Sequence, residues 1–303
     1  MRITVQQLRY CNAIAEMGSM IAASRRLKVA QPTLSEAVSL VERELGFSVF
    51  KRSNSGVEPT ERGVEFLARA RQVVQQMDNL DERYGTGQPD RLRFVVSSQH
   101  FSFAEQAFIN LMGDVSDSRY HLALNETRTM QIIEDVASCE SDMGVLFLSR
   151  ANEAAVGRLL ERNKLEFTEM FEAVPHALMR CGHPLAGAET VSLDELADFP
   201  QVTFLQGTYE SSALAEEPLW APSQKAIQVS DRGLMMSTLL HSDAYTVTSG
   251  VHSEYVGTSS VVAVPVRSGE RMHIGYITLR GADLDEVSAQ FINLMKRFAG
   301  VEK

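Results

Sequence analysis

Apolar residues near the start of the chain recur at helical spacing and predict three short helices. Thr4 and Gln7 are placed to form a capping box that opens the first helix. Its apolar face consists of Leu8, Cys11 and Ala15. Free cysteine is commonly buried, so we expect Cys11 to be a packing residue. Gly18 ends this helix, and Ser19 is a suitable cap for the next one.

Residues 19–35, with the sequence SMIAASRRLKVAQPTLS, are the most informative stretch. The small pair Ala22-Ala23 lets two helices cross closely, and Leu27 and Val29 mark a turn. A further helix begins at Gln31 and ends at Gly46. Its core face is predicted to be Leu34, Val38, Val41 and Leu45. This is the pattern of a helix-turn-helix, whose second helix enters the DNA major groove.

The opposite face of that helix supplies the candidate DNA contacts. They are Gln31, Pro32, Thr33, Ser35 and Glu36, with Arg25 on the preceding helix. Glutamine can hydrogen-bond adenine at two atoms, and hydroxyls can serve bases or phosphates. Residues 50–59 predict a tight hairpin whose Lys51 and Arg52 would contact phosphates beside the groove. The alternative for this hairpin is a solvated surface turn.

These residues resemble the winged helix-turn-helix of the LysR-type transcriptional regulators. The matching positions are Leu8, Ala15, Gly18, Ser19, Ala22, Ala23, Leu27, Val29, Gln31, Pro32, Leu34, Ser35, Leu45, Gly46, Phe50, Arg52, Pro59, Thr60 and Gly63. Two positions depart from the family pattern. Ala30 stands where the family has a capping Ser or Thr, which removes about 1 kcal/mol of helix stability. Glu36 stands where the family has a cation, so that contact is not carried over.

A long helix is predicted from Thr60 to Tyr84, with apolar residues three and four apart. The seam consists of Gly63, Phe66, Ala70, Val73, Met77, Leu80 and Tyr84. Such a heptad pattern favours pairing of two chains, as the resemblance also implies. The alternative is an amphipathic helix packed on its own domain. Residues 85–90, rich in Gly and Pro, predict a hinge.

From residue 91 the pattern changes to strands alternating with helices, which predicts α/β lobes with parallel strands. The expected crossovers lie near residues 161–166 and 265–268. The predicted fold is thus an α winged helix-turn-helix head (1–60), a linker helix (61–84), a hinge (85–90) and an α/β effector domain (91–303). Its lobe I is 91–163 with 268–303, and its lobe II is 164–267. This two-lobed body resembles the periplasmic-binding-protein-like domain of the same family, most closely at residues 183–186 and 192–196.

Polar residues at predicted strand ends mark the expected ligand site, since ligands of open α/β sheets lie there. The candidates are Ser97, Ser98, Gln99, Thr127, Arg128, Thr129, Phe147, Phe204, Gln206, Thr208, Thr248 and Ser249. Arg128 is the cation among these strand ends, so it is the candidate partner of a carboxylate effector. For each residue the alternative is an ordinary strand-end cap.

Charge and motifs narrow the function further. The net charge is −10, yet residues 1–60 carry eight Lys or Arg against five Glu, so a basic head joins an acidic body. We find no catalytic, phosphate-binding or metal-ligating motif, no signal peptide and no membrane span. Three widely spaced cysteines favour reduced thiols in the cytoplasm.

The expectation is a cytoplasmic regulator that is not an enzyme and has neither cofactor nor metal. Its expected partners are double-stranded DNA, a small effector and a second copy of itself, as dimer or tetramer. RNA polymerase is a further candidate partner. The alternative function is a ligand-independent architectural repressor.

Overall fold

The computed structural model describes residues 2–53, 56–84, 91–115, 119–206, 214–219, 225–251 and 260–301. The chain divides into two compact units. The first is Met1–Pro89 with Ser138–Glu140, and the second contains Asp90–Ala137 and Ser141–Lys303. Among the described residues, no helix is both long and apolar enough to cross a bilayer. The predicted hinge, residues 85–90, lies outside the described residues.

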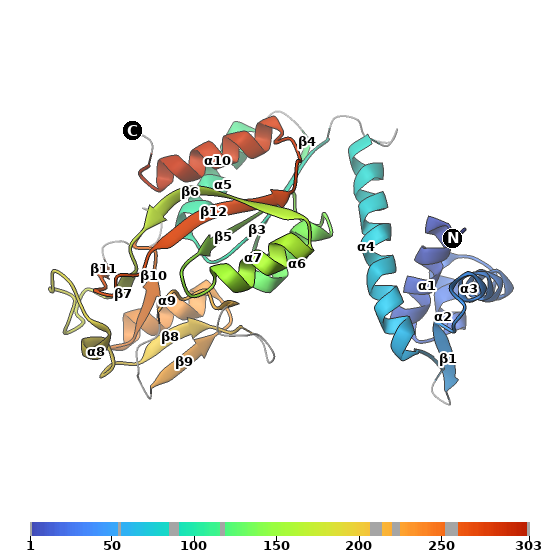
Figure 1. Ribbon diagram of the computed structural model, residues 1–303, viewed down its shortest axis with the longest axis horizontal. Coiled ribbons are helices and arrows are strands. Elements are labelled where there is room, and N and C mark those ends of the chain that lie inside the picture. Colours follow the sequence, from blue (N-terminus) through green and yellow to red (C-terminus); the bar gives the residue numbers. More distant parts are fainter. Residues whose placement is uncertain are drawn as a thin grey trace. The chain divides into compact units, whose positions relative to one another are not determined.

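The first unit is a helical domain with a small hairpin (Figure 1). Its elements are α1 (Val5–Met17), α2 (Met20–Leu27), α3 (Gln31–Leu45), β1 (Phe50–Ser53), β2 (Gly56–Pro59) and α4 (Glu61–Tyr84). The predicted capping box at Thr4 and Gln7 is confirmed, as is the cap of α2 by Ser19. Burial beside Glu42 raises the pKa of the Cys11 thiol to about 12, consistent with a packing role.

The hairpin is anchored to the junction of α1 and α2. The backbone N–H of Val57 donates to the carbonyl of Gly18 at 2.9 Å. A Cβ on Gly56 would lie 2.4 Å from that same carbonyl oxygen, and Gly56 has φ +137°, so glycine is required there. Glu42 of α3 accepts from the backbone N–H groups of Val49 and Phe50. The hairpin is therefore held in a fixed position beside α3.

The second unit consists of two α/β lobes (Figure 1). The first lobe has a sheet of order β4-β3-β5-β12-β6, in which β12 runs antiparallel to its neighbours. Its strands are β3 (Arg91–Ser98), β4 (Arg119–Glu126), β5 (Met143–Leu148), β6 (Leu165–Ala173) and β12 (Met272–Leu279). One face packs against α5 (Ser102–Asp114) and α10 (Glu286–Phe298). The other packs against α6 (Thr129–Ala137) and α7 (Glu153–Arg162).

The second lobe has a sheet of order β11-β7-β10-β8-β9. Its strands are β7 (His176–Arg180), β8 (Gln201–Phe204), β9 (Ala226–Val229), β10 (Tyr245–Thr248) and β11 (Val261–Pro265). The short α8 (Leu193–Leu196) packs against one face, and α9 (Arg232–His241) packs against the other. A capping box between Ser192 and Glu195 opens α8.

The predicted lobe boundary at residues 163 and 164 is wrong. β6 pairs with β12 from Leu165 to Ala173, so it belongs to the first sheet. Leu165, Met170 and Phe171 are buried in the core clusters of that lobe, which fixes the strand there. The chain crosses between the lobes at residues 174–175 and returns at residues 268–271, close to the expected second crossover.

Candidate functional site

The first candidate surface is the polar face of α3. Leu34, Val38 and Val41 are buried in the core of the helical domain, which fixes the rotation of α3 about its axis. The opposite side exposes five of the predicted residues: Gln31, Pro32, Thr33, Ser35 and Glu36. Their polar groups therefore face away from the interior of the domain.

The start of α3 lacks a side-chain cap, as the sequence predicts. Ala30 stands at the cap position and makes no side-chain hydrogen bond, and Pro32 occupies the first turn. Arg25 is exposed in the last turn of α2, just before this start. Thus the helix end presents backbone N–H groups without a competing side-chain acceptor from Ala30.

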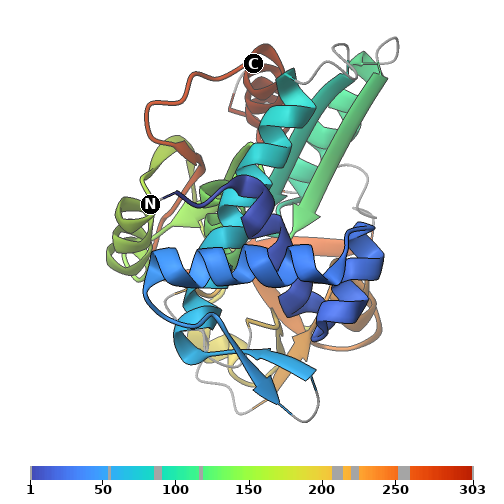
Figure 2. The ribbon, with the colours of Figure 1, turned by 90° about the vertical axis from the view of Figure 1, so that its right-hand side faces the viewer.

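A groove of about 410 Å³ lies between α3 and the β1–β2 hairpin. Figure 2 shows the helix and the hairpin as ribbons. Gln31, Ser35 and Ser39 line it on the helix side, and Lys51 and Val57 line it on the strand side. The exposed ammonium group of Lys51 lies 3.6 Å from a Glu58 oxygen. The side chain of Arg52 lies outside the described residues. The arrangement has the shape of a recognition helix with a basic wing.

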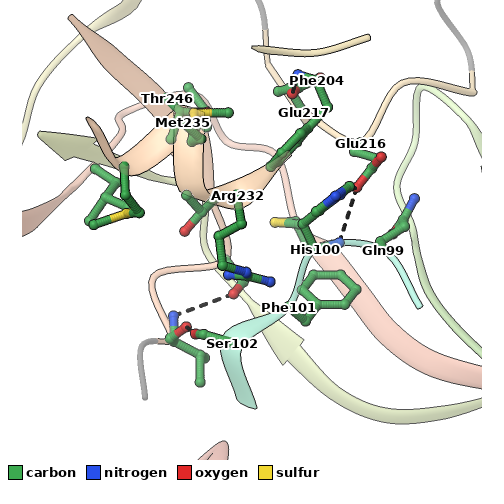
Figure 3. Close-up of a pocket in the computed structure, with 17 residues that line it drawn as sticks. Gln99, His100, Phe101, Ser102, Phe204, Glu216, Glu217, Arg232, Met235 and Thr246 are labelled. Atoms are coloured by element: carbon green, nitrogen blue, oxygen red, sulfur yellow. Dashed lines mark hydrogen bonds and ion pairs between the residues drawn. The ribbon is translucent and has the colours of Figure 1, made fainter. Parts of the chain in front are cut away.

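The second candidate site is a pocket between the two lobes, which Figure 3 shows. Its volume is about 80 Å³, small beside ordinary ligand pockets of about 300–1,000 Å³. Its apolar wall consists of Phe101, Leu178, Phe204, Met235, Met236, Val247, Val251 and Met272. In this closed arrangement the pocket has room for a small molecule or for part of a larger one.

The structure brings four of the predicted ligand residues to this pocket: Gln99, Phe204, Thr248 and Ser249. Gln99 is nevertheless engaged by the fold. Its amide nitrogen donates to Thr129 Oγ1 at 2.7 Å, and its oxygen accepts from the backbone N–H of Phe147 at 3.0 Å. Thr129 in turn donates to the carbonyl of Leu214. The strand-end-cap alternative therefore describes Gln99 and Thr129 well.

Other predicted ligand residues do not line the pocket. They are Ser97, Ser98, Thr127, Arg128, Thr129, Phe147 and Gln206, while Thr208 lies outside the described residues. Ser97 donates to a buried Asp135 oxygen at 2.5 Å, away from the pocket. The guanidinium of Arg128 donates to the carbonyl of Gln206 at 3.1 Å. Arg128 is thus not placed to bind a carboxylate in this pocket.

Three charged or titratable residues of the pocket were missed by the sequence reasoning: His100, Glu216 and Glu217. His100 Nδ1 lies 2.7 Å from Glu216 Oε2, and the backbone N–H of His100 donates to the same oxygen at 3.1 Å. The imidazole ring also stacks on Phe204, with 3.6 Å between ring centroids. The two glutamates follow a Leu-Ala pair and precede Pro-Leu, in a stretch without helical or strand periodicity. An acidic pair between apolar neighbours was the available signal.

Glu217 is almost fully buried, with 5% of its surface exposed. One of its oxygens accepts from the backbone N–H of Phe204 at 2.8 Å. Burial raises the pKa of Glu217 to about 8; the hydrogen bond from Phe204 opposes this shift, and the neighbouring Glu216 carboxylate adds to it. A carboxyl group in this state can change its charge when its surroundings change.

Arg232, also missed, joins the lobes at the rim of the pocket. From the start of α9 in the second lobe, its guanidinium pairs through two nitrogens with Glu126 at the end of β4. Its Nε also lies 3.7 Å from a Glu105 oxygen of α5. Two carboxylates of the first lobe thus balance one cation of the second.

The fold and these two sites define a class of protein: a winged helix-turn-helix domain joined to a two-lobed ligand-binding domain. Comparison with known families agrees. Residues 5–64 match the bacterial regulatory helix-turn-helix protein family of LysR type, and residues 90–300 match the LysR substrate binding domain. The chain belongs to the LysR family of transcriptional regulators, and the predicted resemblance and fold are confirmed.

Individual relatives match over parts of their length. The uncharacterized transcriptional regulator YnfL of Escherichia coli is 32% identical over 67% of this chain and 66% of its own length. The small neutral protease regulatory protein of Streptomyces coelicolor is 44% identical over 26% of this chain and 24% of its own. This chain therefore matches less than two thirds of the length of each of these relatives.

Solved structures share the fold over nearly the whole chain. CbnR bound to its target DNA superimposes with a TM-score of 0.62 at 16% identity, covering 97% of this chain and 99% of that one. A full-length OxyR variant from Pseudomonas aeruginosa superimposes with a TM-score of 0.61 at 19% identity, covering 98% of this chain and 95% of that one.

Proposed function

We propose that this chain is a sequence-specific DNA-binding transcription regulator whose DNA binding is modulated by a small molecule in the interlobe pocket. The observation that carries the proposal is the exposed polar face of α3 beside the basic hairpin. Gln31, Thr33, Ser35 and Glu36 would face base edges or phosphates, and Arg25, Lys51 and Arg52 would contact the backbone. CbnR, which has the same fold, has been solved with its target DNA.

The active species is proposed to be a dimer or a pair of dimers joined through α4. Val73, Met77 and Leu80 are apolar and exposed on that helix in the single chain. A two-fold dimer would place two copies of α3 about 34 Å apart, or a multiple of that, matching half-sites on one face of DNA. The operator would therefore be an imperfect palindrome.

Modulation requires only that the ligand bind one arrangement of the lobes better than another. Two chain crossings, at residues 174–175 and 268–271, connect the lobes, and residues of both lobes line the pocket. Closure around a ligand would change how the domain meets neighbouring subunits or RNA polymerase. On this proposal the protein works in the cytoplasm as a regulator, without catalysis and without a cofactor.

The decisive experiment selects bound sequences from random duplex DNA with the full-length protein and then compares variants. Gln31→Ala should relax the sequence preference at one base pair of each half-site by about 1–3 kcal/mol, while non-specific binding at low salt survives. Ser39→Ala is the matched control. Ser39 lies on the same exposed side, but its hydroxyl donates to the carbonyl of Ser35.

Two results would overturn the proposal. One is a full-length protein that fails to bind duplex DNA at low salt. The other is a selected sequence profile that is identical for the native protein and the Gln31→Ala variant, because Gln31 would then read no base.

A further inference from the structure

Arg232 and His100, which line the interlobe pocket, are already engaged within the protein. The backbone N–H and imidazole of His100 contact Glu216. The guanidinium of Arg232 is balanced by Glu126 and Glu105. An anionic ligand entering this pocket would have to displace one of these carboxylates before it met a cation. The pocket therefore has little charge left for a carboxylate ligand.

Two carboxyl oxygens of the same pocket differ from Arg232 and His100 in this respect. Within the described part of the chain, Glu216 Oε1 and Glu217 Oε2 are buried and have no hydrogen-bond partner. Both side chains are 5% exposed, and both residues line the pocket. Figure 3 shows the pair beside His100 and Phe204. Buried polar atoms without partners are rare, because each one destabilises the folded state, so a missing hydrogen-bond partner is indicated.

We propose that this pocket recognises an organic cation, a primary ammonium group on a short apolar chain, through Glu216 and Glu217. The inference rests on the proposed function of the pocket as a ligand site. The ammonium would donate to Glu216 Oε1 and Glu217 Oε2, which an N–H₃ group can do at once. The apolar chain would lie against Phe204, Met235 and Met236. Such a ligand satisfies both unpartnered oxygens and fits the small volume.

Proton release accompanies this binding mode. Burial raises the pKa of Glu217 to about 8, so its carboxyl is mostly protonated at pH 7 before a ligand binds. An ammonium beside it favours the carboxylate, because an opposite charge lowers the pKa of a carboxyl group. Glu216, His100 and Arg232 face the same pocket and keep their partners. Binding at pH 7 should therefore release close to one proton. A neutral ligand that accepts a hydrogen bond from protonated Glu217 would release none.

The test is calorimetry on the full-length protein at pH 7, in buffers of different ionisation enthalpy and at constant ionic strength. The probes are n-butylammonium chloride and sodium butyrate, which have the same chain and opposite charge. Butylammonium should bind and release close to one proton, and butyrate should bind at least tenfold more weakly. Glu217→Gln and Glu216→Gln should each weaken butylammonium at least tenfold. Glu172→Gln, an exposed site in the first lobe, is the matched control and should change nothing.

Three results would overturn the inference. They are preference for butyrate, no binding of butylammonium up to tens of millimolar, and butylammonium binding that both glutamine variants retain. Thermal unfolding of each variant shows whether it is folded. Binding of the same preparations to duplex DNA is measured in parallel. A protein that binds DNA but not butylammonium refutes the ligand class alone, whereas one that binds no DNA refutes the proposed function.

Discussion

At the scale of single residues, the polar groups at strand ends serve two different purposes. Ser97 and Gln99 complete hydrogen bonds within the first lobe, and Thr129 donates to the carbonyl of Leu214 in a connecting segment. Glu216 and Glu217, which line the pocket and each have one oxygen without a partner among the described residues, come from a connecting segment instead. A strand-end position indicates the neighbourhood of a pocket, but burial of the lobe requires most polar atoms there to be paired internally.

The buried carboxyl of Glu217 predicts a pH-dependent stability. Its pKa is about 8 in the folded protein and near the ordinary 4.5 when unfolded. The folded state therefore favours the protonated form, so the contribution to stability is complete below pH 4.5 and lost as pH rises to about 8. Glu217→Gln removes the ionisation and keeps an oxygen for the N–H of Phe204. We expect the variant to gain stability relative to the native protein as pH rises from 5 to 8.

Urea unfolding at pH 5 and pH 8 measures this difference. Glu216, His100 and Arg232, which face the same pocket, are present in both proteins, so the comparison isolates the substitution at Glu217. Glu172→Gln on the surface is the control and should show no such trend. A difference between native protein and Glu217→Gln that is the same at both pH values would contradict the raised pKa.

The missing cap of α3 predicts that Ala30→Ser stabilises that helix. Ala30 is exposed and has the extended backbone of a cap residue, with φ −66° and ψ 139°. A serine hydroxyl there can accept from the N–H of Thr33, which contributes about 1 kcal/mol. Hydrogen exchange of α3 amides in the full chain should slow about fivefold. Ala30→Gly, which supplies no hydroxyl, is the control, and equal protection in both variants would contradict the capping argument.

At the scale of elements, local patterns predicted most helices and strands. Strand β5, with the sequence MGVLFL, is an apolar run bounded by polar residues at both ends, which is the kind of local pattern that predicts a strand. Helix α7 and strand β11 were not predicted. The sheet of β6 was predicted wrongly, because period-two alternation shows that a strand forms but not which partner it pairs with. Its partner β12 lies about a hundred residues further along the chain.

Helix α4 combines two kinds of apolar surface that one periodic pattern could not separate. Ala70 is buried and Phe66 is partly buried, packed against the core of the helical domain, as the intramolecular alternative predicts. Further along, Val73, Met77 and Leu80 are 46%, 39% and 51% exposed. The side chain of Tyr84 lies outside the described residues. Only the second half of the seam is therefore available to another chain.

This division predicts the effect of charge on self-association. Met77→Lys should weaken the dimer at least tenfold, because a cation would be buried in an apolar seam. Gln76→Lys adds the same charge at the neighbouring exposed position and should leave the dimer intact. Sedimentation equilibrium of the full-length variants measures both. A Met77→Lys protein that dimerises as tightly as the native chain would refute α4 as the seam.

At the scale of the whole second unit, the two lobes are linked by more than the chain crossings. Arg232 of the second lobe pairs with Glu126 and lies close to Glu105 of the first. The segment of residues 214–219 also touches both lobes: the carbonyl of Leu214 accepts from Thr129, and that of Leu219 accepts from Gln201. These contacts hold the two lobes together in the arrangement that the structure shows.

The Arg232–Glu126 pair predicts an energetic coupling across the lobes. Arg232→Gln leaves the carboxylates of Glu126 and Glu105 without a counter-charge, and Glu126→Gln leaves one cation partly uncompensated. The two substitutions together should therefore cost less than the sum of their separate costs. The side chains are 22% and 24% exposed, so solvent screening limits the coupling to about 1 kcal/mol.

Urea unfolding of the native protein, both single variants and the double variant gives this coupling energy, and small-angle scattering reports whether Arg232→Gln opens the lobes. The control cycle uses Arg271→Gln and Glu172→Gln. That pair joins Glu172 of β6 to Arg271 at the end of the second crossing, at 3.0 Å, and both side chains are 50% exposed. It should show little coupling and no change in scattering, because exposed pairs are strongly screened. Strict additivity at Arg232 and Glu126 would mean that the pair does not hold the lobes together, and closure would then depend on the 214–219 segment.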